Sequence, residues 1–220
     1  MNRCYPEYAQ RLSMRLDQWL LRHQQELHFK TTWMGIPALT NPLDAWVYQE
    51  LLAHLRPETV IEIGGSQGGG SLYLAHLLDL IGGGHVISVE IDRSRWIAPD
   101  HPRVVKIDGD SGSIETFEHV RANTKGTTVI IHDADHRRDA VRRDLELYAP
   151  LVTRGSYFIV EDGIVDLFNP GDAIAAGEQP GPLRAIDEFL AEHPEFEIDP
   201  SCERYLLTYN PRGFLKRKEL

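Results

Sequence analysis

The sequence predicts an α/β protein whose doubly wound, mostly parallel sheet of seven strands is covered by helices on both faces. From residue 59 onward, short apolar runs alternate with segments of helical periodicity. A glycine-rich turn follows the first run, and acidic residues follow several later runs. Alternating strands and helices are typical of parallel sheets with crossover helices. Because such sheets bind ligands beyond the carboxyl ends of their strands, we expect the functional residues directly after each strand.

The first 55 residues are predicted to form a helical extension. Between residues 8 and 28, leucine, tryptophan and histidine recur at three- and four-residue steps, which favours a helix. A second helix is expected over residues 43–55, where Asp44 lies in the first turn and suits the positive end of the helix dipole. We therefore expect an N-terminal helical extension over residues 1–55 and one compact unit over residues 56–220.

The remaining elements follow from apolar runs and turn residues. The predicted strands span residues 59–63, 85–91, 103–107, 127–131 and 156–160, with a final pair at 196–198 and 204–209. The predicted helices span residues 71–81, 137–148 and 182–193. Gly82 suits the end of the first of these helices, and Pro182 suits the start of the last. Loops are expected at 30–42 and 162–181, and the second is long enough to act as a lid.

The composition is that of an acidic globular chain. Its 220 residues fit one large domain, 42% of them are hydrophobic, and the formal net charge is -10. Nucleic-acid-binding proteins usually present a basic face, so a nucleic-acid partner is not expected. Two small basic groups are interpreted as a solvated helix face and a charged tail; they are Arg137, Arg138, Arg142 and Arg143, and Lys216, Arg217 and Lys218.

The cysteines and the apolar runs favour a cytoplasmic location. Cys4 and Cys202 are too few for a disulfide framework or a zinc site, and we expect both to be reduced. No apolar run resembles a signal peptide or is long enough to span a bilayer. A membrane partner is therefore not expected.

The turn after the first strand reads EIGGSQGGGS over residues 62–71. Glycines allow a sharp turn and a close approach of the backbone to a ligand. The dinucleotide fingerprint requires glycines at relative positions one, three and six, but a start at Gly64 or Gly65 places Ser66 or Gln67 at the third position. This spacing argues against an oxidoreductase with a nicotinamide cofactor. The lysine of a phosphate-cradling loop is also absent.

The turn instead fits the pattern acidic-x-Gly-x-x-x-Gly, with Glu62, Gly64 and Gly68 at the defined positions. This pattern is typical of methyltransferases that bind S-adenosylmethionine. The Glu62 carboxylate can accept a charge-assisted hydrogen bond from the amino group of that cofactor, directly or through water. The predicted cofactor-binding residues of the turn are Glu62, Gly64, Gly65, Ser66, Gln67, Gly68 and Ser71.

Acidic residues also follow the second and third strands. Glu90 or Asp92 is placed to bind ribose hydroxyls, because the second strand lies beside the turn of the first. Asp110, followed by Ser111, is placed to reach the adenine. Each acid alone fits equally well as a loop or helix-cap residue. Their recurrence after three successive strands favours a cofactor site.

Three more acidic residues follow the fourth and fifth strands. If these strands are neighbours, Asp133, Glu161 and Asp162 converge beside the cofactor. Carboxylates gathered without compensating cations repel one another, and a hard divalent cation removes that repulsion. Oxygen ligands indicate magnesium, or manganese, rather than zinc. The alternative is that Asp133 and Asp135 cap the next helix while the other two acids belong to a solvated loop.

The same segment supplies the candidate catalytic residues. A metal on Asp133 would hold a substrate oxygen and favour its deprotonation. Asp135 or His136 is placed to accept the proton, and an imidazole near its free pKa suits that role. A competing interpretation, an iron site of His132, Asp133 and His136, is disfavoured because adjacent residues of a strand point to opposite faces.

Six segments of the chain contain motifs that resemble those of a known protein family. They are TWMGIP at 32–37, NPLDAWVYQE at 41–50, EIGGSQGGGS at 62–71, YAPLV at 148–152, GSYFIVED at 155–162 and NPRGFLKR at 210–217. Together they resemble the cephalosporin hydroxylase and rhamnosyl O-methyltransferase family. The resemblance runs from about Thr31 to Arg217, which is most of the chain.

The resemblance implies a Rossmann-like class I methyltransferase fold, S-adenosylmethionine as the methyl donor, and a magnesium ion on Asp133, Glu161 and Asp162. His136 stands where the more distant catechol and caffeoyl-coenzyme A O-methyltransferases have a catalytic lysine. Relatives are often oligomeric, so we expect a homo-oligomer with contacts through the N-terminal helix. Hydroxylation, which the family name also mentions, is not expected because no oxygen-activating site is evident.

We therefore predict a magnesium-dependent O-methyltransferase that acts on a hydroxyl group of a sugar or other secondary metabolite. The main alternative is a non-catalytic S-adenosylmethionine-binding partner of an oxygenase in antibiotic methoxylation or hydroxylation. Metal-dependent methyl transfer would distinguish the enzyme from the binding partner.

Overall fold

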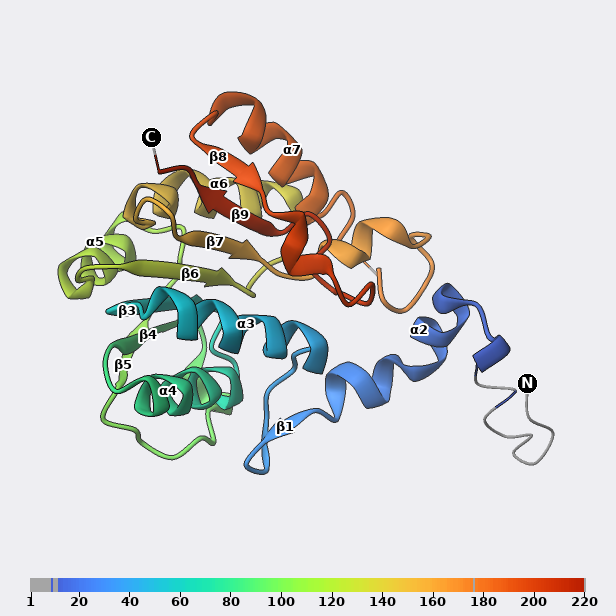
Figure 1. Cartoon of the computed structure of the whole chain (residues 1–220), viewed down its shortest axis with the longest axis horizontal. Helices are drawn as coiled ribbons and strands as arrows, with labels where there is room; N and C mark the ends of the chain where they lie inside the picture. Colours follow the sequence, from blue (N-terminus) through green and yellow to red (C-terminus); the bar gives the residue numbers. More distant parts are fainter. Residues whose placement is uncertain (1–8, 10–11, 176, 220) are drawn as a thin grey trace.

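The computed structural model describes residues 9, 12–175 and 177–219 (Figure 1). Its centre is a seven-stranded sheet with the strand order β5-β4-β3-β6-β7-β9-β8. The strands are β3 (Thr59–Ile63), β4 (His85–Glu90), β5 (Val104–Asp108), β6 (Thr128–His132), β7 (Tyr157–Val160), β8 (Phe196–Ile198) and β9 (Phe214–Arg217). The first five pair in parallel, and β9 pairs antiparallel with both β7 and β8. The predicted mostly parallel sheet is confirmed.

Helices cover both faces of this sheet. They are α3 (Pro42–Leu55), α4 (Gly69–Ile81), α5 (Ile114–Asn123), α6 (Arg138–Tyr148) and α7 (Pro182–Glu192). A further helix, α2 (Leu16–Gln24), packs in a separate cluster. The shorter turns are the π-helical η1 (Gln25–Phe29) and the 3-10 turns η2 (Arg93–Arg95), η3 (Ala149–Leu151), η4 (Gly163–Leu167) and η5 (Pro200–Glu203). Local signals set their ends: the Asn41 side chain accepts the Leu43 N–H and caps α3, and Gly82 ends α4 in the left-handed conformation.

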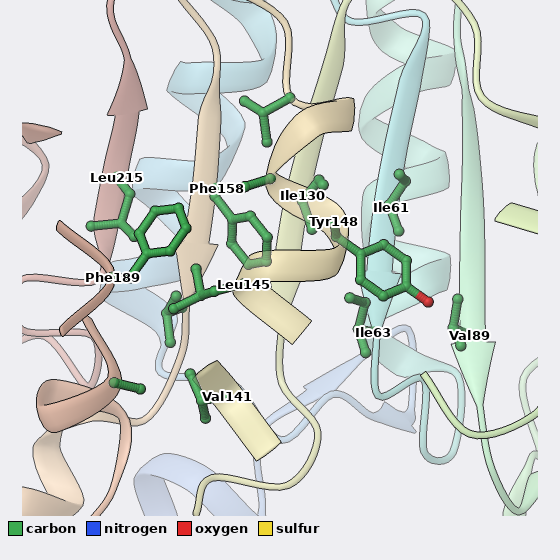
Figure 2. Packing of buried hydrophobic residues seen from close by; sticks show 14 of the residues in the cluster. Ile61, Ile63, Val89, Ile130, Val141, Leu145, Tyr148, Phe158, Phe189 and Leu215 are labelled. Atoms are coloured by element: carbon green, nitrogen blue, oxygen red, sulfur yellow. The ribbon is translucent and has the colours of Figure 1, made fainter. Parts of the chain in front are cut away.

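Alternate residues of each strand pack into different hydrophobic clusters. Ile61 and Ile63 lie on the face covered by α5, α6 and α7, where Leu145 of α6 also packs (Figure 2). Val60 belongs to the cluster that includes α3 and α4. Because successive strand residues point to opposite faces, the side chain of Glu62 is directed toward α3 and α4.

The structure differs from the predicted elements in several places. The strand predicted at 204–209 is wrong: these residues form turns, and the last strand is β9. The physical reason is that Leu206 has a positive φ of 65°, while Asp44 holds the Tyr209 backbone N–H at 2.8 Å. Helix α5 was not predicted, although Ser113 caps it by accepting the Thr116 N–H. The predicted loop at 30–42 contains a hairpin of β1 (Thr32–Trp33) and β2 (Ile36–Pro37).

The N-terminal part of the chain joins the fold in two different ways. Leu20 of α2 packs with Ile164, Ile174 and Tyr209 in a small third cluster, at the end of the sheet where the loop after β7 lies (Figure 1). The predicted helix at 8–28 is interrupted at residues 14 and 15, and residues 1–8 and 10–11 lie outside the described chain. By contrast, α3 packs directly on the sheet. The division of the chain at residue 55 therefore remains a prediction.

Two further predictions concern thiols and apolar segments. Cys202 is buried and forms no disulfide with any residue that the structure describes, and Cys4 lies outside those residues. Within the part of the chain that the structure describes, no helix combines the length and the apolar character needed to cross a bilayer.

Candidate functional site

The candidate site lies at the carboxyl ends of β3, β4, β5 and β6, on both sides of the point where the strand order reverses. The cavity there has a volume of about 570 Å³. Its lining includes Gly64 and Ser66 after β3, Glu90 and Ile91 at the end of β4, Gly109, Asp110 and Ser111 after β5, Asp133, Ala134, Asp135 and His136 after β6, and Asp162 after β7. Parallel sheets bind ligands at this switch point.

The glycines of the turn are required first by the protein's own packing. Gly64 has φ 103°, and a Cβ there would lie 1.9 Å from the backbone oxygen of Asp133. Gly68 has φ 89°, and a Cβ there would lie 2.6 Å from Ala98 and 2.7 Å from the Trp96 ring. Gly64 lines the large cavity, whereas the space beside Gly68 is filled by protein side chains. Ligand approach is therefore not the reason for glycine at position 68.

The Glu62 carboxylate is buried behind the turn. It accepts a hydrogen bond from the Ser71 hydroxyl, and burial raises its pKa to about 7. Glu62, Gly65 and Gln67 line an adjoining small cavity of about 30 Å³ between the turn and α3, which shares Gly64, Ser66 and Asp133 with the large cavity. This placement follows from the strand parity described above.

The two acids at the end of β4 have different environments. Glu90 is buried, accepts the backbone N–H of Ser66 at 2.6 Å and that of Asp92 at 3.0 Å, and lines the large cavity. Asp92 caps η2 by accepting the Ser94 N–H at 3.0 Å and does not line that cavity.

The two residues after β5 lie at the cavity with their side chains already engaged. The Asp110 carboxylate accepts the Gly112 N–H at 2.9 Å and lies 3.3 Å from the Arg143 guanidinium. The Ser111 hydroxyl donates to Asp144 at 2.6 Å.

The acidic residues after β6 and β7 surround His136. Its Nε2 lies 3.3 Å from Asp133 and 3.6 Å from Asp162, and its Nδ1 lies 3.3 Å from Glu178. Potential ligand atoms of Asp133, His136 and Asp162 all lie within 4.8 Å of one another. Burial opposes a charge on His136, but the hydrogen bond to Asp133 and the charge of Asp162 raise its pKa well above the ordinary value. The positive charge of the imidazolium thus offsets the negative charge of the carboxylates.

Glu161 lies near Asp133 at the small cavity. Its Oε1 accepts the Tyr48 hydroxyl of α3 at 2.8 Å, and both residues line the small cavity together with Asp133. Burial and the charges of Asp133 and Asp162 raise the pKa of Glu161 well above its ordinary value. The structure therefore brings Asp133, Asp162 and His136 together, with Glu161 adjacent but bonded to α3.

The remaining residues of this segment have other partners. Both oxygens of Asp135 accept from Arg137, which lowers the pKa of Asp135 to about 2. His132 is fully buried, and its Nε2 lies 3.1 Å from Asp144 of α6. His132 points away from Asp133, so the three residues of the iron-site alternative do not converge.

Sequence reasoning missed a buried network that holds Glu161 and Asp162. The Asn210 side chain donates to the Tyr48 hydroxyl at 2.6 Å and accepts the Asp162 N–H at 3.1 Å. Asp162 itself has a φ of 56°, which is unusual for a residue other than glycine. Both Tyr48 and Asn210 lie in segments that carried the family resemblance, but their spacing along the chain does not indicate a contact.

Comparison with known proteins agrees with this geometry. The family model described as Rhamnosyl O-methyltransferase/CmcI matches residues 25–218. The rhamnosyl O-methyltransferase of Mycobacterium leprae is 34% identical over 195 residues, which cover 86% of this chain and 83% of that protein. The rhamnosyl O-methyltransferase of Mycobacterium tuberculosis (strain ATCC 25618 / H37Rv) is 32% identical over 196 residues, which cover 86% of this chain and 78% of that protein.

Among solved structures, CmcI in a form described with Mg and SAM has a TM-score of 0.69 and 26% sequence identity, and the match covers 93% of this chain and 85% of that chain. The fold, the family model and the curated relatives agree with the resemblance carried by the six sequence segments. The chain therefore belongs to the rhamnosyl O-methyltransferase/CmcI family of S-adenosylmethionine-dependent O-methyltransferases.

Proposed function

We propose that this protein transfers the methyl group of S-adenosylmethionine to a hydroxyl group of a sugar or a related natural product, with a magnesium ion at the acid cluster. The proposal rests mainly on one observation: Asp133, His136 and Asp162 of the acid cluster line the same cavity as Gly64 and Glu90. A methyl donor placed at the turn would then lie beside the acids. The sugar is supported by the rhamnosyl O-methyltransferases that this chain resembles.

The large cavity suits the cofactor in size and chemistry. Its volume of about 570 Å³ lies within the ~300–1,000 Å³ typical of small-ligand sites. The Glu90 carboxylate would accept hydrogen bonds from ribose hydroxyls. Ile91, an apolar residue that is 72% exposed at the cavity wall, would cover one face of the adenine.

The acid cluster suits a hard divalent cation. Asp133, Glu161 and Asp162 would hold it, because carboxylate oxygens are the ligands that magnesium and manganese prefer. In the structure, the positive charge among these acids comes from His136, and a bound metal ion would supply that charge instead. When bound, the ion would polarise the acceptor hydroxyl and fix its position.

His136 is the better of the two candidate proton acceptors. Both oxygens of Asp135 are engaged by Arg137, whereas His136 lies between the acids at the cavity wall. In the reaction, the acceptor oxygen would form a C–O bond to the methyl carbon. The electron pair of the broken C–S bond would stay on sulfur, and the hydroxyl proton would pass to His136, which is neutral once the metal ion supplies the positive charge among the acids. Alignment of these atoms supplies much of the rate enhancement.

The decisive experiment measures methyl transfer to a panel of glycosides and phenols by a mass gain of one methyl group. We expect turnover to stop in chelator and in Asp133→Asn, with cofactor affinity retained because the turn lies on β3. Asp135→Asn is the comparison variant and should keep most of the activity, since Asp135 is paired with Arg137. Full activity of a metal-free preparation would refute the metal role. A protein that binds S-adenosylmethionine but methylates nothing in the panel would favour the non-catalytic alternative.

We also propose that the protein forms a homo-oligomer through α2. Leu16 and Leu21 of α2 and Leu167 and Leu206 beside it are exposed along a groove of about 410 Å³. Leu21→Glu should lower the mass measured by light scattering if this groove is a contact between copies. An unchanged mass would place any contact elsewhere.

A further inference from the structure

A second cavity of about 180 Å³ adjoins the acid cluster at His136 and Asp162. His28, His136 and Asp162 line both this cavity and the large one, so the two share a wall at the proposed reaction centre. The rest of its lining comes from α2 and η1, from the segment after β7, and from the C-terminal loop at Tyr209. Neither the family match nor the metal proposal assigns a role to this space.

Two polar groups at this cavity have no hydrogen-bond partner among the residues that the structure describes. The Tyr209 hydroxyl and Nδ1 of His28 are both buried and unpaired, and the two rings stack with centroids 5.8 Å apart. Tyr209 is only 3% exposed. Unpaired buried polar atoms are uncommon in native proteins, and one explanation is a ligand group that completes them.

Tyr209 and His28 are also suited to bind hydroxyl groups. Burial raises the pKa of Tyr209 to about 12, so its phenol keeps the proton and is able to donate. His28 lies in the π-helical turn η1, and such turns are frequent at functional sites.

The remaining walls of the cavity are mixed in character. Ile164, Val165 and Ile174 supply an apolar side, and Gln24 and Glu178 supply polar groups. A volume of about 180 Å³ exceeds the ~10–15 Å³ that one water needs and is below the ~300 Å³ at which pockets for drug-sized ligands begin. Such a space suits one small ring with an apolar face and a hydroxylated edge, which describes a monosaccharide.

We propose that this second cavity is the acceptor subsite and that it takes a single sugar ring of a glycoside. Tyr209 and His28 hydrogen-bond the hydroxyls next to the one that is methylated, while the reacting hydroxyl faces His136 and Asp162. This inference rests on the proposed function and specifies where the acceptor lies. It also gives the N-terminal helix a role in substrate binding, separate from any role in oligomer contacts.

The test measures binding of methyl α-L-rhamnopyranoside and of other methyl hexosides to the full chain saturated with S-adenosylhomocysteine and magnesium, by saturation-transfer NMR. Two variants probe the cavity: Tyr209→Phe removes one donor, and Ala173→Trp fills the space from an exposed rim position. Tyr205→Phe is the matched control, because Tyr205 lies in the same loop but does not line the cavity.

We expect Tyr209→Phe to weaken glycoside binding about tenfold, as for the loss of one hydrogen bond, and Ala173→Trp to abolish it. Affinity for S-adenosylhomocysteine should stay unchanged in all three variants. Unaltered glycoside binding in both cavity variants would overturn the inference, as would a wild-type protein that binds no glycoside of the panel. If a protein that binds no glycoside still methylates phenols, the proposed O-methyl transfer is supported and only the sugar subsite is rejected.

Discussion

At the scale of single residues, the environment of each acid decides its chemistry. Glu62 and Glu90 both lie near the glycine-rich turn, but only Glu90 lines the large cavity. Asp135 and His136 are neighbours in sequence, but Asp135 is paired with Arg137 whereas His136 contacts three carboxylates. Residue type alone therefore does not assign a role here.

The buried carboxyl of Glu62 predicts a pH-dependent stability. Its folded-state pKa of about 7 lies above the ordinary 4.5, so between these values the folded chain keeps a proton that the unfolded chain has released. The free energy of unfolding must then fall as the pH rises through this window, by at most about 3 kcal/mol. Glu62→Gln removes this loss and should stabilise the cofactor-free protein at pH 8 more than at pH 5. Urea unfolding at both pH values measures the difference; an equal effect at both would contradict the shifted pKa.

The two acids after β4 are predicted to differ in cofactor binding. Glu90→Gln should weaken the binding of S-adenosylhomocysteine by about 1.5–3 kcal/mol, because a charged hydrogen-bond acceptor at the cavity is lost. Asp92→Asn should change it little, since Asp92 caps η2 outside the cavity. Calorimetric titration of both variants measures this. A larger loss in Asp92→Asn would show that the ribose lies elsewhere.

At the scale of secondary structure elements, α3 connects the acid cluster to the C-terminal loop. Its Asp44 accepts from Thr208 and from the Tyr209 backbone, and its Tyr48 bonds Glu161 and Asn210. Burial raises the pKa of Asp44 to about 6, although the hydrogen bonds it accepts oppose that rise. Helix α3 therefore positions residues that lie more than 100 positions away in the chain.

This connection predicts that Tyr48 orients a metal ligand without touching the ion. Tyr48→Phe should lower the affinity for Mn²⁺ about 10–100-fold, as is usual when a partner of a metal ligand is removed. Tyr157→Phe is the matched control, because the Tyr157 hydroxyl also bonds a carboxylate, that of Asp199, but away from the site. Electron paramagnetic resonance of free Mn²⁺ gives both affinities. Equal losses in the two variants would mean a general loosening of β7 instead.

At the scale of the whole molecule, two large clusters hold the sheet between its helices and a small third cluster holds α2. The third cluster contains few buried residues, among them Leu20 and Ile164. Helix α3 contributes Val47, Tyr48 and Leu52 to the cluster on the sheet. The helices before and after residue 30 therefore differ in their importance for folding.

A pair of truncations is predicted to separate the two N-terminal helices. Removal of residues 1–29 should leave a cooperatively folded protein that still binds S-adenosylhomocysteine, because both sheet clusters remain complete. Removal of residues 1–55 should prevent folding, because one face of the sheet loses its α3 cover. Circular dichroism melting curves compare the two. A folded protein after the longer truncation would support a domain boundary at residue 55.

The sequence by itself determined most strands of the central sheet, the glycine-rich turn and the family. Strand and helix periodicity is local, so β3 to β8 were located to within one residue. The segment at 204–209 was misassigned because its apolar residues allowed a strand, while the positive φ of Leu206 and the bonds to Asp44 depend on distant contacts. The convergence of Asp133 and Asp162 was predicted on the condition that β6 and β7 are neighbours, and the two strands do pair in parallel.

Only the tertiary structure decided what each of these acids contacts. Tyr48 meets Glu161 across 113 positions, and Asn210 meets Asp162 across 48. The stacking of His28 on Tyr209 and the second cavity beside them likewise join opposite ends of the chain. The physical reason is that periodicity reports the face a side chain occupies, whereas its pKa, partners and accessible space depend on which other segments pack against that face.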